Sequence, residues 1–300
     1  MAAIVIPRNL AAEARREATG GLREWVAGLP DVLQGLAARW SLRLGEPYQP
    51  GGQCSWVAPV RMAGGATAVL KAGWRHFEAE HEADGLRAWA GRGAVRLYAE
   101  HRCGETSALL LEPCVPGTPL AAATPGPEQD IVVARLLGRL WIQPPPGHPF
   151  IMLTAMCDQW AAEAEARLAA SPGAIDPGLA RNGIALMRRL PETAGRAVLL
   201  CIDLHAGNIL AARREPWLVI DPKPCLGDPA FDPVQHMLNC EDRLASDPAG
   251  LARRMAALLG LDPERVTLWL LARCVQESPG SPFMAAVAAR IAAALPRGWR

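Results

Sequence analysis

Residues 198–223 read VLLCIDLHAGNILAARREPWLVIDPK and set polar side chains directly behind two apolar runs. Asp203 and Asn208 lie five positions apart after the first run, and Asp221 ends the second run, 13 positions beyond Asn208. We expect the runs at 198–200 and 217–220 to pair as a two-stranded ribbon. Asp203 can orient and deprotonate a hydroxyl, while Asn208 and Asp221 offer the hard oxygen ligands that suit Mg²⁺. Asp203 and Asn208 alone also fit an ordinary turn, because this spacing often arises by chance.

A lysine upstream fits the same chemistry. Residues 55–60 and 66–72 are typical of a β-hairpin, and the second strand ends in Lys71. Lys71 and Lys223 are the two lysines of the chain. The helix expected at 77–89 offers Glu82 as the acidic partner of Lys71, with Glu78 as second choice. Lys71 alone would be interpreted as a surface charge, but the order of the pieces along the chain favours a reaction site.

Protein kinases assemble a phosphoryl-transfer site from such parts: a D-x-x-x-x-N loop, a downstream metal-binding Asp and a strand lysine. Two further segments are then placed to contact a nucleotide. Gly52 and Ser55 lie where backbone N–H groups can cover phosphates, although a full G-x-G-x-x-G is absent. Glu112 and Cys114 follow the last expected strand, where a hinge would present backbone groups to adenine.

The rest of the chain predicts an α+β fold with two lobes. Residues 9–19 and 22–42 are expected to be helices, and strands at 95–99 and 107–111 would complete a small antiparallel sheet. After a Pro-rich connector the chain is predicted to be mainly helical, at 128–142, 150–169, 177–189, 233–245, 249–259, 263–277 and 281–295. We therefore expect an N-terminal lobe at 1–112 and a helical C-terminal lobe at 113–300, with a ligand cleft between them.

Composition excludes several classes of protein. The 300 residues are 50% hydrophobic, so the chain is not disordered. Lys and Arg number 31 against 30 Asp and Glu, which argues against nucleic acid as a partner. No apolar run is long enough to span a membrane, and the N-terminus does not resemble a signal peptide, so a cytoplasmic location is expected. The eight cysteines are expected to be free thiols.

The chain resembles the aminoglycoside/hydroxyurea antibiotic resistance kinase family, which includes streptomycin 6-kinases, from about Trp25 to Glu277. The motifs that match in order are Arg39-Trp40, 52–60, 68–71, 81–83, 93–97, 116–120, 203–208, 220–223 and 227–232.

The resemblance implies a two-lobed protein-kinase-like fold that uses ATP and Mg²⁺ to phosphorylate a small molecule with a free hydroxyl. In this sequence it implies Asp203 as catalytic base, Asn208 and Asp221 as metal ligands, and Lys71 paired with Glu82 on the phosphates.

Two departures from the family pattern bear on activity. Many of these kinases have His-Gly-Asp at the catalytic loop, whereas this chain has Cys201-Ile202-Asp203. The larger Ile202 is expected to narrow the site, and Cys201 is expected to be a small buried residue. The metal Asp is followed by Pro222-Lys223, which adds a positive charge near the phosphates.

Several further residues are candidates for contact with the substrate. His205 lies inside the loop, where it can touch substrate or brace the loop. Asp228 can bind a cationic substrate or the loop backbone. Glu277, together with Glu241 and Asp242, can line an acceptor pocket or form a solvated helix face.

The acceptor remains open between a streptomycin-like aminoglycoside, a hydroxyurea-like molecule and a metabolic sugar or amino alcohol. The alternatives to an antibiotic kinase are a small-molecule kinase of primary or secondary metabolism and a non-catalytic kinase relative that binds nucleotide or ligand. A protein kinase is disfavoured, because no A-P-E segment follows Asp221. The sequence leaves open monomer or homodimer, and ATP or GTP.

Overall fold

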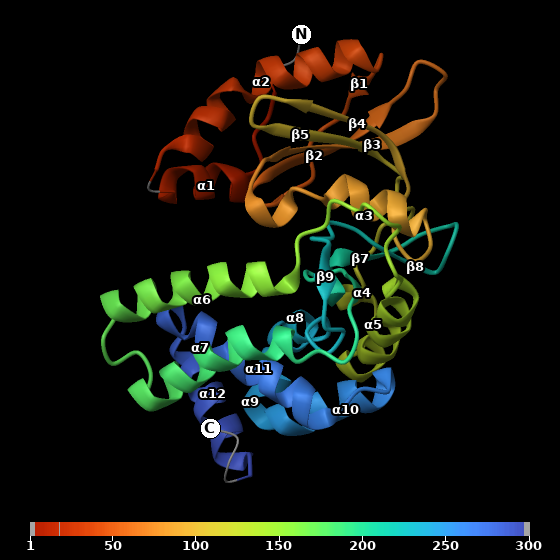
Figure 1. The fold of residues 1–300 in the computed structure, drawn as a ribbon. Coiled ribbons are helices and arrows are strands. Elements are labelled where there is room, and N and C mark those ends of the chain that lie inside the picture. Colours follow the sequence, from red (N-terminus) through yellow and green to blue (C-terminus); the bar gives the residue numbers. More distant parts are fainter. Residues whose placement is uncertain (1–3, 18, 297–300) are drawn as a thin grey trace.

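The computed structural model describes residues 4–17 and 19–296 and has two lobes, a sheet with flanking helices and a larger helical body (Figure 1). The N-terminal lobe contains a five-stranded antiparallel sheet in the order β1-β2-β3-β5-β4. Its strands are β1 (Arg43–Leu44), β2 (Ser55–Arg61), β3 (Thr67–Trp74), β4 (Leu97–Cys103) and β5 (Thr106–Leu111).

The two leading helices, α1 (Arg8–Arg16) and α2 (Gly21–Arg39), pack on one face of this sheet. Apolar residues of α2 recur at three- and four-residue spacing, so Leu22, Leu29 and Leu36 fall on one side of the helix and are buried. They share a hydrophobic cluster with Leu70 and Leu110 of the sheet. The helices before residue 45 therefore belong to the core of the N-terminal lobe.

Strand alternation divides the sheet residues between the two lobes. Ala108 and Leu110 of β5 pack with α1 and α2, whereas Leu109 and Leu111 belong to the hydrophobic cluster of the helical lobe. Successive side chains of a strand point to opposite faces, so this division follows directly from the period of two. On β3, Leu70 packs against the leading helices, and Lys71 is thereby placed on the face toward the C-terminal lobe.

The C-terminal lobe is mainly helical and holds the larger hydrophobic cluster. Its helices are α4 (Leu120–Ala123), α5 (Gly126–Leu140), α6 (Leu153–Ala170), α7 (Pro177–Glu192), α8 (Val234–Leu238), α9 (Glu241–Ser246), α10 (Pro248–Leu259), α11 (Pro263–Glu277) and α12 (Pro282–Ala294). Helix α6 runs along the side of this lobe that faces the sheet (Figure 1). The eight cysteines are free, as expected. Among the described residues, the helices lack the combination of length and apolar character that crossing a bilayer requires.

The structure corrects the strand pairing predicted for the segment 198–220. Strand β6 (Val198–Leu200) pairs with β9 (Cys225–Gly227), and β8 (Trp217–Val219) pairs with β7 (Ile209–Ala211). The predicted pairing of the first and second apolar runs with each other is wrong. Each of these four strands has three residues, and so short a run carries too little periodicity to determine which strand it pairs with.

Two predicted helices are each divided. The segment 77–89 forms a 3₁₀ turn, η1 (Phe77–Ala79), followed by α3 (Glu82–Trp89), which packs on the C-terminal lobe through Leu86 and Trp89. The segment 233–245 forms α8 and α9 with a break at Asn239 and Cys240. Asparagine favours such interruptions because its side chain competes for backbone hydrogen bonds; here the Asn239 amide donates to the Gln235 carbonyl.

A buried carboxylate joins four helices of the C-terminal lobe. Asp130 of α5 is fully buried and accepts hydrogen bonds from His236 of α8, Arg243 of α9 and Arg254 of α10, at 2.6–2.9 Å. Burial acts to raise the pKa of Asp130, but these three donors outweigh it and lower the pKa. The ionised carboxylate is therefore the form that stabilises the fold.

We expect Asp130→Asn to lower the free energy of unfolding by about 3 kcal/mol at neutral pH, because it leaves buried cationic partners uncompensated. A lowered carboxyl pKa stabilises the fold above the unfolded value near 4, and this contribution is lost as the pH falls further. The difference between variant and wild type in urea unfolding should therefore shrink on acidification. Glu165→Gln, which breaks an exposed pair with Arg188, is the control and should cost less than about 1 kcal/mol. Equal losses for the two variants would contradict the account.

Candidate active site

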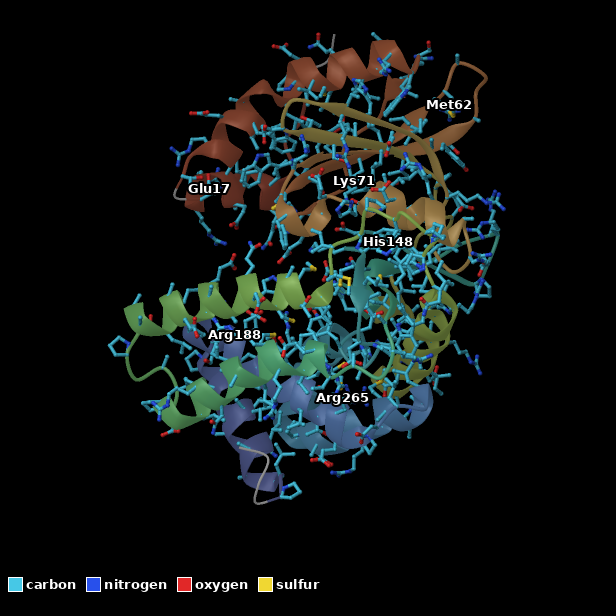
Figure 2. The ribbon with its side chains drawn as sticks, in the orientation of Figure 1. Glu17, Met62, Lys71, His148, Arg188 and Arg265 are labelled. Atoms are coloured by element: carbon cyan, nitrogen blue, oxygen red, sulfur yellow. The ribbon has the colours of Figure 1, made fainter. Side chains whose placement is uncertain are left out.

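Lys71 links the two lobes through two carboxylates. Its Nζ lies 2.5 Å from Glu82 Oε2 on α3 and 2.5 Å from Asp221 Oδ1, which follows β8 in the C-terminal lobe. The Lys71 side chain is nearly buried, and Figure 2 shows it between the sheet and the helical lobe. Of the two acidic partners considered for Lys71, the structure brings Glu82 to it.

The charged groups around Lys71 shift one another's pKa values. Burial acts to lower the pKa of Lys71, but Asp221 and Glu82 outweigh burial and raise it, so the ammonium stays charged. Burial acts to raise the pKa of Asp221, and Lys71 and Lys223 outweigh it and lower it. Burial raises the pKa of Glu82 to about 7 against the attraction of Lys71. Asp221 is thus held as a carboxylate, the form that binds a metal ion.

The loop 201–208 carries Asp203 and Asn208 and ends in a 3₁₀ turn, η2 (Ala206–Asn208). The Asn208 side-chain nitrogen donates to the Asp203 carbonyl at 3.0 Å, which directs the amide oxygen away from that carbonyl. The Asp203 carboxylate accepts a hydrogen bond from Lys223 Nζ at 2.8 Å. The loop therefore presents one carboxylate and one amide oxygen at its two ends.

Asp232, fully buried, holds the start of this loop. Its carboxylate accepts hydrogen bonds from the Ile202 N–H at 2.7 Å, the Cys201 N–H at 3.1 Å and the Trp141 indole at 2.9 Å. Burial raises the pKa of Asp232 to about 6, although these donors oppose the shift. Ile202 has φ = 62°, in the left-handed region that β-branched residues rarely adopt. The donors fixed by Asp232 thus hold a strained residue immediately before Asp203.

Asn208 and Asp221 fit a magnesium site of the kind that kinases use. Mg²⁺ is commonly bound by one or two protein oxygen ligands together with phosphates and water. The orientation of the Asn208 amide and the ionised state of Asp221 supply two such oxygens. Two protein oxygens match a metal ion whose other ligands would be phosphate oxygens and water.

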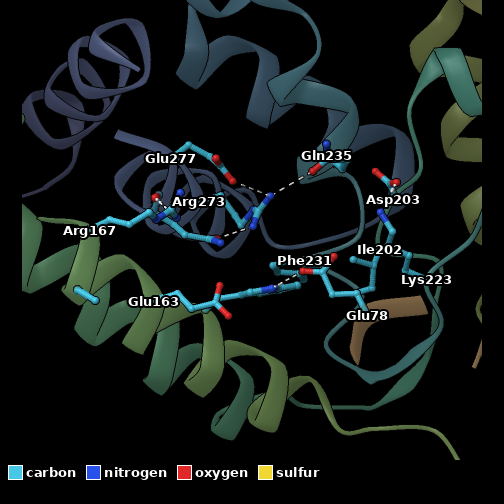
Figure 3. Close-up of a pocket in the computed structure, with 13 residues that line it drawn as sticks. Glu78, Glu163, Arg167, Ile202, Asp203, Lys223, Phe231, Gln235, Arg273 and Glu277 are labelled. Carbon is cyan, nitrogen blue, oxygen red and sulfur yellow. Dashed lines mark hydrogen bonds and ion pairs between the residues drawn. The ribbon is translucent and has the colours of Figure 1, made fainter. Parts of the chain in front are cut away.

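A cavity of about 570 Å³ opens beside Asp203 (Figure 3). Ile202, Asp203 and Lys223 line one end, and Glu163 and Arg167 of α6 line another part of its wall. The remaining lining residues are Glu78, Trp160, Ala166, Phe231, Gln235, Arg273, Gln276 and Glu277. A volume of this size accommodates a small organic molecule rather than a peptide chain.

The residues predicted to contact the nucleotide have different surroundings in the structure. Ser55 begins β2, Gly52 lies three positions before it, and a Cβ added to Gly52 would approach the Ser55 hydroxyl to 3.0 Å. The Glu112 carboxylate forms an ion pair with Arg214 at 2.8 Å, and its N–H donates to the Arg96 carbonyl. Any nucleotide contact from Glu112 must therefore come from its carbonyl. Cys114 is half-buried in the connector that follows.

The structure gives different surroundings to the three residues predicted to contact the substrate. Glu277 lines the cavity and pairs with Arg273 at 3.3 Å. His205 accepts a hydrogen bond from the Gly207 N–H, so its ring braces the loop. Asp228 is buried and is held by Arg265 and Trp269, away from the cavity lining.

Several features of the cavity are not evident in the sequence. Glu78 of η1 accepts a hydrogen bond from the Trp160 indole at 2.7 Å, which joins the N-terminal lobe to α6. The Arg273 guanidinium lies over the Trp160 ring at 5.3 Å from its centroid. Lys223 pairs with Asp203 across 20 positions of sequence. The aromatic and acidic residue types are visible in the sequence, but their contacts depend on the packing of α6 against α11 and η1.

Comparison with known proteins agrees with this geometry. The family model "Aminoglycoside/hydroxyurea antibiotic resistance kinase" matches residues 39–279. A hydroxyurea phosphotransferase of Kitasatospora aureofaciens is 36% identical over 282 residues, covering 92% of this chain and 79% of that protein. A streptomycin 6-kinase of Streptomyces griseus is 35% identical over 285 residues, covering 92% and 90%. A choline kinase from Streptococcus pneumoniae shares the fold, with a TM-score of 0.61, 12% identity and coverage of 88% and 98%.

The left-handed backbone at Ile202 predicts an inverted order of stability among its variants. Ile202→Gly should be more stable than Ile202→Ala by about 1 kcal/mol, because glycine adopts positive φ without the penalty that Cβ imposes. At Ile184, a comparably buried residue of α7, Ala should instead be more stable than Gly by about 1 kcal/mol. Urea unfolding of the four variants measures both differences. The same order at the two sites would show that the backbone of residue 202 is unstrained.

Proposed function

The chain belongs to the aminoglycoside/hydroxyurea antibiotic resistance kinase family, and we propose that it transfers the γ-phosphoryl group of ATP to a hydroxyl of a small molecule bound beside Asp203. Membership makes the protein a phosphotransferase with an alcohol group as acceptor. The observation that carries the proposal is that the proposed proton acceptor, at the small-molecule cavity, lies on the same loop as a proposed metal ligand. The Asp203 carboxylate lines the small-molecule cavity, and it belongs to the same loop as Asn208.

The reaction divides among few residues. Asp203 orients the acceptor hydroxyl and takes its proton while the acceptor oxygen bonds to phosphorus and the bond from phosphorus to the ADP oxygen breaks. Lys71, fixed by Glu82, binds the α- and β-phosphates. Asn208 and Asp221 hold Mg²⁺, which supplies charge neutralisation for the phosphates. Backbone groups at Gly52 and Ser55 cover the phosphates, and those of Glu112 and Cys114 face the adenine.

A streptomycin-like aminoglycoside is the acceptor that the cavity favours. Four carboxylates line it, on Glu78, Glu163, Asp203 and Glu277, against three cationic side chains, on Arg167, Lys223 and Arg273. Lys223 and Arg273 are already paired with lining carboxylates, so the surplus of negative charge suits a cationic ligand. The volume is also far larger than hydroxyurea fills.

Antibiotic resistance is the biological role that this chemistry supports, since a phosphorylated hydroxyl alters both the charge and the shape of the drug. We propose that the lobes divide at the connector after β5, as 1–112 and 113–300. The acceptor is a small molecule, and the protein acts as a monomer or homodimer.

We expect Asp203→Asn to lower kcat for streptomycin phosphorylation by about 10²- to 10⁴-fold, because the variant keeps the shape of the side chain and loses the proton acceptor. Turnover is measured as streptomycin-dependent formation of ADP. Asp242→Asn is the matched control, since Asp242 is an exposed carboxylate of α9 outside the cavity, and it should retain wild-type kcat. Wild-type turnover by the Asp203 variant would refute the mechanism.

A further inference from the structure

We propose that Lys223 binds the γ-phosphoryl group of the nucleotide, and that it is held on Asp203 until the nucleotide arrives. The inference rests on the proposed function and adds to it a residue that recognises the phosphoryl group to be transferred. It also makes the availability of Asp203 dependent on the nucleotide, because one ammonium serves both partners.

The position of Lys223 is the first observation that supports this role. Its Nζ lies 2.8 Å from Asp203 Oδ2, and both side chains are about one-fifth exposed at the edge of the cavity. The Lys223 N–H donates to the Cys201 carbonyl at 2.9 Å, which fixes the backbone of this residue against the loop. Asp221 is only two positions earlier in the chain. The ammonium is therefore anchored on the loop that carries Asp203, and Figure 3 shows Lys223 beside Asp203 at one end of the cavity.

Electrostatic repulsion between Asp203 and the nucleotide also favours a cation at this position. An acceptor oxygen within hydrogen-bonding reach of Asp203 must approach phosphorus to about 3–3.5 Å for reaction. The negative oxygens of the γ-phosphoryl group then come within roughly 6 Å of the Asp203 carboxylate, where like charges repel. A cation between them removes this repulsion and stabilises the charge that spreads over the transferred oxygens.

Other cations of the site are committed elsewhere. Lys71 Nζ is held by Glu82 and Asp221, at 2.5 Å from each carboxylate. Arg273 lies over Trp160 and pairs with Glu277. Arg167 donates to the Gln276 carbonyl at 3.0 Å. His205 accepts the Gly207 N–H on a ring nitrogen within its own loop, so it does not act as a cation there. Among the residues that line the cavity, Lys223 is the cation in contact with Asp203.

The side chain can make the exchange that the proposal requires. A lysine ammonium has three donors on a flexible stem, so it can leave one carboxylate oxygen or bridge it to a phosphate oxygen. With Lys223 on Asp203, the Oδ2 atom of the carboxylate is occupied by the ammonium and is not open to the acceptor hydroxyl. Binding of the triphosphate, but not of the diphosphate, draws the ammonium away and exposes the carboxylate to the acceptor.

The test compares two nucleotides by titration calorimetry in the presence of Mg²⁺: ADP and the β,γ-imido analogue of ATP. Lys223→Met should weaken binding of the analogue by about ten- to a hundredfold, the value of a lost charge-assisted hydrogen bond. Its affinity for ADP should change by less than about twofold, because ADP lacks the γ-phosphate. Lys223→Arg should restore most of the affinity for the analogue, and Lys223→Gln serves as a second neutral variant if the Met variant is unstable.

Lys71→Met is the matched control, since it removes the other lysine of the chain from the α- and β-phosphates and should weaken ADP and the analogue by similar factors. Equal effects of Lys223→Met on the two nucleotides, or no effect on either, would overturn the inference and assign Lys223 to a purely structural pair with Asp203. Failure of the wild-type protein to bind either nucleotide would instead overturn the proposed function, and this inference with it.

Discussion

The ion pairs of Lys71 are the constraint on which the arrangement of the site depends. A single ammonium contacts a carboxylate of α3 and a carboxylate beyond β8, at 2.5 Å in each case. Strand alternation on β3 aims Lys71 at the helical lobe, and the packing of Leu86 and Trp89 on that lobe holds α3 beside it. Because each contact needs the others, a shift of either lobe would separate Asp221, the proposed metal ligand, from Lys71, the proposed phosphate-binding residue.

The reacting end of the site is maintained by buried polar groups at some cost in stability. Asp232 is fully buried, and the hydrogen bonds that it accepts from backbone N–H groups position the residue before Asp203. Ile202 adopts a left-handed backbone where glycine would be less strained, and its side chain lines the cavity beside Asp203. Strain of this kind persists only where the surroundings over-determine the backbone, and here it coincides with the wall of that cavity.

The sequence predicted the fold class and the features that depend on local pattern. The spacing of Asp203, Asn208 and Asp221 and the strand lysine Lys71 indicated groups that the structure brings to one site, although Lys71 lies within β3 and not at its expected end. The pairing of β6 with β9 was missed, because partners 25 or more positions apart are chosen by packing and not by periodicity. The contact of Lys223 with Asp203 and that of Glu78 with Trp160 were missed because they too depend on tertiary packing. Asp228 was expected to bind either a cationic substrate or the loop backbone, and its carboxylate accepts hydrogen bonds from Arg265, Trp269 and the Ala230 N–H.

The central claim is that this site transfers a phosphoryl group to a small cationic acceptor. Mass spectrometry of an acceptor panel incubated with the protein, ATP and Mg²⁺ tests it most directly, with streptomycin, other aminoglycosides, hydroxyurea and amino sugars in the panel. The account predicts that one phosphate is added to streptomycin or a closely related aminoglycoside, with an equal amount of ADP formed. Phosphorylation of hydroxyurea alone would contradict the assigned acceptor. An unmodified panel, together with tight binding of ATP, would contradict the claim of catalysis and favour a non-catalytic relative.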